Sequence, residues 1–279
     1  MAENTAQQAI QRILVALDAS EHSLGALEVA AHLAARLGAE LSGLFVEDIV
    51  LSESVKLPFT RQTTFFSSGP REINTDRLEK QFKRQATRAR EAIERQAEQV
   101  QVQWSFRVVR GQVHDELCLA CEPVDLVSLG HMGWSPTLRQ QLGSTAQAFL
   151  QEGMPRVLLS QRDSSLGQSI FVLCEESVEI PKLLQTASQL SRAEGLLVLL
   201  FWQTEEILET LRAQAKNWLE THKQEAMFQL IPTKRPQTLL RLLKEQEAGL
   251  LLLSRRSPTL QQADFRAFLG RSTCPILCI

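Results

Sequence analysis

The sequence lacks the features that mark several common classes of protein. Its longest apolar runs, such as Leu196–Trp202, are far too short to cross a bilayer. The polar start MAENTAQQAIQR has no apolar core of a signal peptide. The formal net charge of −2 argues against nucleic acid as a partner, because nucleic-acid binders carry a basic face or a high pI. We therefore expect a cytoplasmic protein that binds neither membrane nor nucleic acid.

Cysteine is also scarce and irregularly spaced. Five cysteines are an odd number, which argues against a disulfide framework. Cys118 and Cys121 form a C-x2-C pair within a helical-looking segment, but no second pair follows at zinc spacing. We expect these thiols, and Cys274 and Cys278 beside the last strand, to be packing residues, with thiol chemistry or a metal as the lesser alternative for the pair. No H-x-x-x-H motif or acidic cluster indicates a metal site.

The sequence does contain an internal repeat. Four short stretches of the first half recur in the same order in the second, namely ILVALD (13–18) as IFVLCE (170–175), LVSLG (126–130) as LLLLS (250–254), SPTL (135–138) as SPTL (257–260), and MPRVLL (154–159) as CPILCI (274–279). This order indicates a tandem duplication. The polar joint QRDSSLGQ (161–168) predicts domains at 1–162 and 163–279.

Within each half, short apolar runs alternate with longer amphipathic segments. Strands are predicted near 13–17, 41–46, 104–109, 126–129 and 156–160, and again near 169–174, 196–202, 226–231, 249–254 and 275–279. Helices are predicted between them, with Ser20 as the N-cap and Gly38 as the end of the first. The pattern predicts an α/β fold of two tandem, doubly wound, five-stranded parallel-sheet domains.

Ligands of such sheets bind beyond the carboxyl ends of the strands, where the strand order reverses. Asp18 ends the first predicted strand, and Gly130 ends the fourth. A glycine loop follows, in which Gly130, Gly133 and Gly143 are separated by two and nine residues and Ser144-Thr145 comes next. Glycines allow close backbone approach, and a helix start with hydroxyls favours an anion. Ordinary turn and cap roles remain the alternative.

Two common nucleotide motifs are missing. GxxxxGK[ST] is absent, and the turn after the first strand, VALDASEHS, is not GxGxxG. Neither a P-loop nor a nicotinamide-cofactor site is therefore expected.

The spacing of the glycine loop resembles the nucleotide-binding signature of the universal stress protein family, G-x2-G-x9-G followed by Ser or Thr. ILVALDAS, LFVED, VRGQV, DLVSLGHMG and MPRVLL also resemble the family at corresponding places. The resemblance covers 13–160 well and 170–279 more loosely. It implies the fold of the adenine nucleotide alpha hydrolases, with ATP or AMP as the ligand and with Mg²⁺ as an ion that can come with the nucleotide.

The resemblance also implies which residues contact the nucleotide. Asp18 and the backbone at Ala16 and Leu17 would meet the adenosine, and Val46 would meet adenine. Ribose and phosphates would be surrounded by Leu129, Gly130, Gly133, Gly143, Ser144 and Thr145. The alternatives are a helix-terminal charge for Asp18 and plain strand core for Val46.

The second half departs from this pattern. Glu175 replaces Asp18, Ser254 replaces Gly130, and Ala263-Asp264-Phe265 replaces Gly143-Ser144-Thr145. A carboxylate at Asp264 would repel phosphate. We expect only the N-terminal domain to bind the nucleotide. Arg255 and Arg256 could bind another anion, with a solvated loop as the main alternative.

The last strand of each half suggests how the halves meet. The resembling family commonly pairs through this strand, and an unpaired edge strand is a liability. We predict that Arg156–Ser160 and Pro275–Ile279 pair antiparallel within the chain and form a pseudo-dimer. A homodimer of the whole chain and a protein partner remain open.

Three further features have open roles. The segment Glu47–Asp76, with Phe59, Phe65 and Phe66, is either a lid or partner-docking segment or local packing. His131 either touches phosphate or is solvent-exposed, and His114 is expected near the same crevice mouth. The arginines of the predicted helix after Thr75, Arg84, Arg88 and Arg95, are expected on a solvated face.

The predicted function is regulation of the stress response by nucleotide occupancy. No residue stands out as a general base or metal ligand for fast hydrolysis, which leaves slow ATP hydrolysis open. An adenylating enzyme is disfavoured because VALDASEHS lacks a double glycine. A nucleotide-free scaffold that acts by dimerisation is the other alternative.

Overall fold

The computed structural model describes residues 10–56, 61–62, 71–72, 75–121, 124–131, 142–151, 156–191, 195–203, 207–262 and 272–279. The strands are β1 (Arg12–Ala16), β2 (Glu40–Asp48), β3 (Arg61–Gln62), β4 (Arg71–Glu72), β5 (Trp104–Gly111), β6 (Leu126–Gly130), β7 (Arg156–Ser160), β8 (Ile170–Leu173), β9 (Leu197–Trp202), β10 (Met227–Ile231), β11 (Leu250–Leu253) and β12 (Ile276–Cys278). The helices are α1 (Glu21–Leu37), α2 (Ile49–Lys56), α3 (Thr75–Val100), α4 (Val113–Cys121), α5 (Ser144–Gln151), η1 (Ser177–Glu179), α6 (Ile180–Leu190), α7 (Leu208–His222), α8 (Pro236–Glu245) and α9 (Pro258–Gln261).

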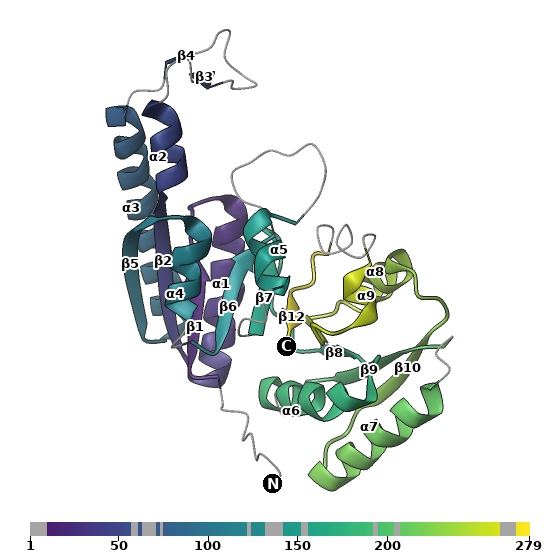
Figure 1. Cartoon of the computed structure of the whole chain (residues 1–279). Helices are drawn as coiled ribbons and strands as arrows, with labels where there is room; N and C mark the ends of the chain where they lie inside the picture. The colour runs from purple at the N-terminus through teal and green to yellow at the C-terminus, as the bar shows by residue number, and fades with distance from the viewer. Residues whose placement is uncertain are drawn as a thin grey trace, which may run out of the picture.

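Ten of these strands form one continuous sheet (Figure 1). Their order is β10-β9-β8-β11-β12-β7-β6-β1-β2-β5, so each half has the order 3-2-1-4-5 in its own strands. All neighbours are parallel except β7 and β12, which pair antiparallel with Leu158 opposite Leu277. The predicted α/β class, the two parallel sheets and their antiparallel pairing through the last strands are confirmed.

Helices cover both faces of this sheet and bury its side chains. One core cluster lies under α1, α3, α6 and α7, and the other lies under α4, α5, α8 and α9. Each cluster contains residues of both halves: Ile13 and Leu184 belong to the first, and Leu14 and Leu251 to the second. Because strand side chains alternate between faces, the apolar runs Ile13–Val15 and Leu250–Leu253 supply both clusters. The two halves therefore share their hydrophobic cores.

The ends of α1 follow the signals in its sequence. The Ser20 hydroxyl accepts a hydrogen bond from the Ser23 amide at 3.2 Å, which caps the first turn. Gly38 ends the helix with φ of +66°, a conformation that costs glycine least. Both predicted caps are confirmed, and α1 is held where it packs over β1 and β6.

The long segment after β2 is partly described. It contains α2 and the short antiparallel pair β3–β4, and α2 lies beside α3 (Figure 1). Phe59, Phe65 and Phe66, on which the lid hypothesis depends, lie outside the described residues. The second half lacks this segment, since only five residues separate β9 from α7.

The surface and the cysteines agree with the composition. Arg84, Arg88 and Arg95 lie on the exposed face of α3, as expected for a solvated face. Of the cysteines, Cys118 is half-buried and the other four are buried as free thiols.

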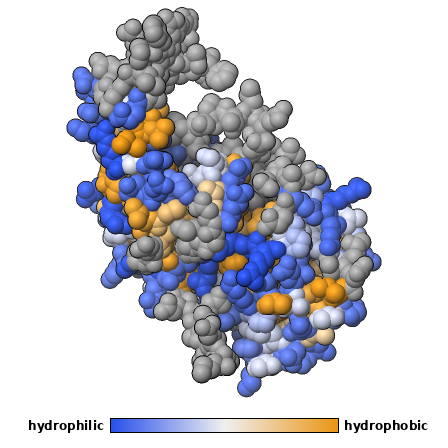
Figure 2. Space-filling view, in the orientation of Figure 1, coloured by the Kyte–Doolittle hydropathy of each residue, from blue (hydrophilic) through white to orange (hydrophobic). Residues whose placement is uncertain are grey.

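Hydrophilic residues cover most of the face in Figure 2, with apolar residues in separate patches. Within the ranges given above, no helix is apolar and long enough to span a membrane, and no three His, Cys, Asp or Glu residues are grouped as metal ligands.

Candidate functional site

The strand order places the topological switch point of the N-terminal half between β1 and β6, at the carboxyl edge of the sheet. β1 and β6 are parallel neighbours, with Val15 opposite Ser128. The chain leaves β1 toward α1 on one face and leaves β6 toward α5 on the other. Because the two connections run to opposite faces, the edge between them is the place where ligands of such sheets bind; it is called the crevice below.

Six of the ten predicted site residues meet at this edge. Ala16, Leu17 and Asp18 follow β1, Leu129 and Gly130 end β6, and Val46 lies two residues beyond Leu44, the partner of Ala16. Leu17 and Leu129 are buried, whereas Ala16, Asp18, Val46 and Gly130 remain partly exposed. Val46 is partly buried and packs against the second core cluster, which is compatible both with a ligand contact and with a strand-core role.

Asp18 is held at the entrance to α1. Its Oδ1 accepts a hydrogen bond from the Ser20 amide at 2.9 Å, and its own amide donates to Ser23 Oγ at 3.4 Å. Ala19 between them has φ of +59°, a left-handed conformation that is rare outside glycine. The turn that starts α1 therefore fixes the Asp18 carboxylate at this edge. Asp18 is thus a charge at the helix terminus, as its alternative role expects, and Ser20 is the N-cap.

Gly130 is required by packing. A Cβ at this position would lie 2.9 Å from the carbonyl carbon of His22 and 3.0 Å from the amide nitrogen of Ser23. The first turn of α1 thus rests directly on the end of β6, and any side chain would push it away.

The start of α5 lies beside the crevice. The Gly143 amide donates to the carbonyl of His131 at 2.7 Å, which ties the helix start to the residue after Gly130. The Gly143 amide is therefore already paired with this carbonyl in the structure. Ser144 and Thr145 lie in the first turn, where amides have no intrahelical acceptor. Gly133 lies outside the described residues.

His131 is buried and neutral. Only 1% of its surface is exposed, and neither ring nitrogen has a hydrogen-bond partner. Burial, and next the nearby charge of His22, lower the pKa of His131 to about 3. Of the two alternatives for His131, phosphate contact and solvent exposure, the second is wrong. His114 instead packs edge-on against Phe149.

The corresponding edge of the C-terminal half is closed. The Leu17 amide bonds to the Leu44 carbonyl, and the Cys174 amide bonds to that of Leu200 in the same way. By this register Glu175 stands at the place of Asp18, and Trp202 stands at the place of Val46.

Trp202 and Glu175 fill that edge together. Trp202 is 1% exposed and its Nε1 donates to Glu175 Oε1 at 2.7 Å. The hydroxyls of Ser257 and Thr259 also donate to this carboxylate. Sequence reasoning missed Trp202, although its place at the end of the second strand of the repeat could have identified it.

A doubly wound parallel sheet, present twice and joined through its last strands, defines a tandem α/β protein. The model of the universal stress protein family matches residues 9–154. Since this is more than half of the sequence, the chain belongs to the universal stress protein family. No curated protein matches the sequence significantly.

Solved structures support the fold over the whole chain. A universal stress protein from Archaeoglobus fulgidus DSM 4304 aligns with a TM-score of 0.72 at 16% identity, over 96% of this chain and 97% of that one. A functionally unknown protein from Pseudomonas aeruginosa PAO1 aligns with a TM-score of 0.57 at 12% identity, over 99% and 94%. A putative universal stress protein from Pseudomonas aeruginosa UCBPP-PA14 aligns with a TM-score of 0.54 at 13% identity, over 98% of this chain and 94% of that one. At these identities the similarity concerns the fold alone.

Proposed function

We propose that the N-terminal half, residues 1–162, binds ATP or AMP at the carboxyl edge of β1, β2 and β6, and that the C-terminal half, residues 163–279, does not. Nucleotide occupancy would bias the loops at this edge and thereby the choice of a protein partner in a stress response. The C-terminal half would serve as the permanent partner of the first sheet. The protein would act in the cytoplasm as a regulator, with Mg²⁺ arriving together with the nucleotide.

The contrast between the two edges carries this proposal. Val46 is a small, partly exposed side chain against which a planar base could lie, whereas the buried indole of Trp202 takes up the same place in the second half. The partly exposed Asp18 can accept hydrogen bonds from ribose hydroxyls, whereas Glu175 already receives three internal donors. A ligand that needs both features fits the first edge alone.

The start of α5 suits the phosphates. Its first-turn amides and the positive end of the helix favour an anion, and the Ser144 and Thr145 hydroxyls add donors. The stretch from Gly130 to Thr145, which matches the nucleotide-binding signature of the family, ends in this first turn. The phosphates would therefore lie between the end of β6 and α5.

Replacing Val46 by Trp tests the proposal directly. Val46→Trp copies the side chain of the closed half, so we expect ATP and AMP affinity to fall at least about tenfold by calorimetric titration, equivalent to about 1.4 kcal/mol. Val108→Trp, on the exposed surface of β5, is the matched control and should bind like the wild type.

Nucleotide released from the freshly purified, denatured protein provides a second measurement. We expect adenine nucleotide from the wild type and little from Val46→Trp. If no nucleotide is released and millimolar ATP leaves the melting temperature unchanged, the chain is a nucleotide-free scaffold, because a bound ligand must stabilise the folded state.

A further inference from the structure

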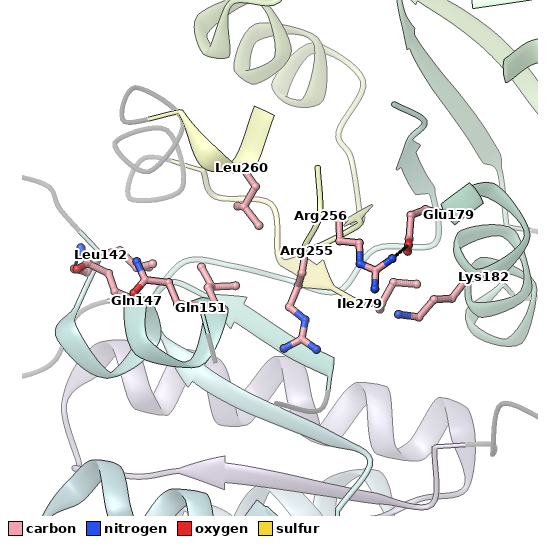
Figure 3. A pocket seen from close by; sticks show the side chains of 10 residues that line it. Leu142, Gln147, Gln151, Glu179, Lys182, Arg255, Arg256, Leu260 and Ile279 are labelled. Atoms are coloured by element: carbon pink, nitrogen blue, oxygen red, sulfur yellow. Dashed lines mark hydrogen bonds and ion pairs between the residues drawn. The ribbon is translucent and has the colours of Figure 1, made fainter. Parts of the chain in front are cut away.

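A cavity of about 650 Å³ lies between the two halves, apart from the edge described above. Gln147 and Gln151 of α5 line it from the N-terminal half, and Lys182 of α6 lines it from the C-terminal half. The loop after β11 adds Arg255 and Arg256. The size falls within the range of pockets that hold small molecules. In Figure 3 the guanidinium of Arg255 lies between the α5 side chains and Lys182.

Cations outnumber anions around this cavity. Lys182, Arg255 and Arg256 line it, and Glu179 is the acidic side chain among its described lining residues. Glu179 is paired with Arg256, whose Nη1 lies 3.4 Å from Oε1 (Figure 3). Counting a carboxylate at Ile279 adds one negative charge, and the nearby Arg156 adds one positive charge. The described groups around the cavity therefore carry an excess of positive charge.

Arg255 is partly buried, and its side chain has no hydrogen-bond or ion-pair partner among the residues that the structure describes. Its Nη1 is buried and makes no hydrogen bond. Burial lowers the pKa of Arg255, and burial together with the neighbouring arginines lowers that of Lys182 although Glu179 opposes the effect. A buried guanidinium donor without an acceptor is costly, and an anion in the cavity would supply the acceptor.

The remaining walls suit an organic anion. Leu142, Leu150 and Leu260 form apolar surface on both sides, and the Gln147 and Gln151 amides offer neutral hydrogen bonds. Guanidinium and ammonium groups together favour phosphate, which Arg binds by a fork of two N–H groups. Hydrophilic residues also gather between the two halves on the face in Figure 2.

We propose that this cavity is a second ligand site, which binds a phosphate-bearing small molecule through Arg255 and Lys182 and holds its remainder against α5. α5 also begins at the proposed nucleotide crevice, so the two ligands would share one helix. The site requires both halves and therefore exists only because the two sheets are joined in one chain.

Titration with pyrophosphate tests this site, with succinate as the probe for a carboxylate ligand. Ser144→Asp serves as the background, because it blocks phosphate at the crevice without touching the cavity. In this background we expect pyrophosphate to bind and raise the melting temperature, and Arg255→Gln to reduce its affinity at least about tenfold. Arg241→Gln, an exposed change on α8, should leave it unchanged.

The stability of the unliganded protein distinguishes a binding role from a structural one. Arg255→Gln should melt at the same or a higher temperature than its parent, because it removes a buried donor without a partner. Tighter binding of succinate than of pyrophosphate would reject the phosphate assignment. The site would be overturned if pyrophosphate did not bind at all or bound Arg255→Gln as tightly as its parent. It would also be overturned if Arg255→Gln and Arg241→Gln reduced the pyrophosphate affinity equally.

Discussion

Glu175 and His131, one at each strand edge, are both buried but differ in whether their polar atoms have hydrogen-bond partners. Glu175 is buried, but Trp202, Ser257 and Thr259 donate to its carboxylate, which makes its burial tolerable. His131 is equally buried and has no such partner, so it stays neutral. The first group closes the edge of the second half, and the second is expected to make the first half sensitive to acid.

His131 should make the nucleotide-free protein less stable in acid. Its pKa is about 3 when folded and about 6.5 when unfolded, so only the unfolded chain takes up a proton as the pH falls below 6.5. Stability is thus lost between pH 6.5 and about 3. From pH 7 to pH 5 this contribution amounts to about 2 kcal/mol.

Urea unfolding at pH 7 and pH 5 measures this effect. His131→Gln cannot take up the proton, so its loss of stability between the two pH values should be smaller than that of the wild type. His32→Gln on the exposed face of α1 is the control and should behave like the wild type. An identical pH dependence in His131→Gln would show that His131 does not carry the effect.

At the scale of elements, α5 links the crevice and the cavity. Its first turn is tied to β6 by the Gly143–His131 hydrogen bond, and its last turns line the space between the halves. We therefore expect a substitution in its first turn to change the affinity for a ligand at the crevice more than it changes the stability of the core.

Ser144→Asp should separate helix stability from anion binding. A carboxylate in the first turn stabilises a helix by about 0.3–1 kcal/mol, yet it repels phosphate. We expect an unchanged or slightly higher melting temperature without ligand, and ATP affinity reduced about tenfold or more in calorimetry. Ser144→Asn is the neutral control and should lose far less. Equal ATP affinity in both variants would mean that the phosphates do not lie at α5.

The elements themselves were largely predictable, because their signals are local. The apolar runs gave strands within one or two residues at most ends, and Ser20 and Gly38 are caps that act through their own backbone. The repeat then implied the pairing of β7 with β12. The parallel arrangement of the strands follows from the alternation of strands and helices together with the right-handed crossover rule, so it could be predicted without knowing any contact between distant residues.

The sites were less predictable, because they depend on residues far apart in the sequence. The bond from Trp202 to Glu175 and the hydroxyls of Ser257 and Thr259 span up to 84 positions. The reason for Gly130 is the backbone of α1, more than a hundred residues earlier. Lys182 drew no attention in the sequence, since its importance arises only where the two halves meet.

At the scale of the whole molecule, one sheet and two shared cores join the halves. Leu158 of β7 is fully buried and lies opposite Leu277 of β12 at the centre of this sheet. We therefore expect the halves to unfold together and not as independent units.

Leu158→Ala tests this cooperativity. Truncating a buried leucine costs about 2–5 kcal/mol. Hydrogen exchange followed by mass spectrometry should then speed up in peptides of both β1–β2 and β8–β9. The exposed Leu119→Ala on α4 is the control and should change stability by less than about 0.5 kcal/mol. Faster exchange confined to the first half would mean that the halves unfold separately.

The most direct measurement of the central claim is a crystal structure grown with excess ATP. The account predicts nucleotide density at the edge formed by Asp18, Val46 and Gly130, with the phosphates toward Ser144. It predicts none at the edge that Trp202 and Glu175 close. An empty first edge, or nucleotide bound at the second, would contradict it.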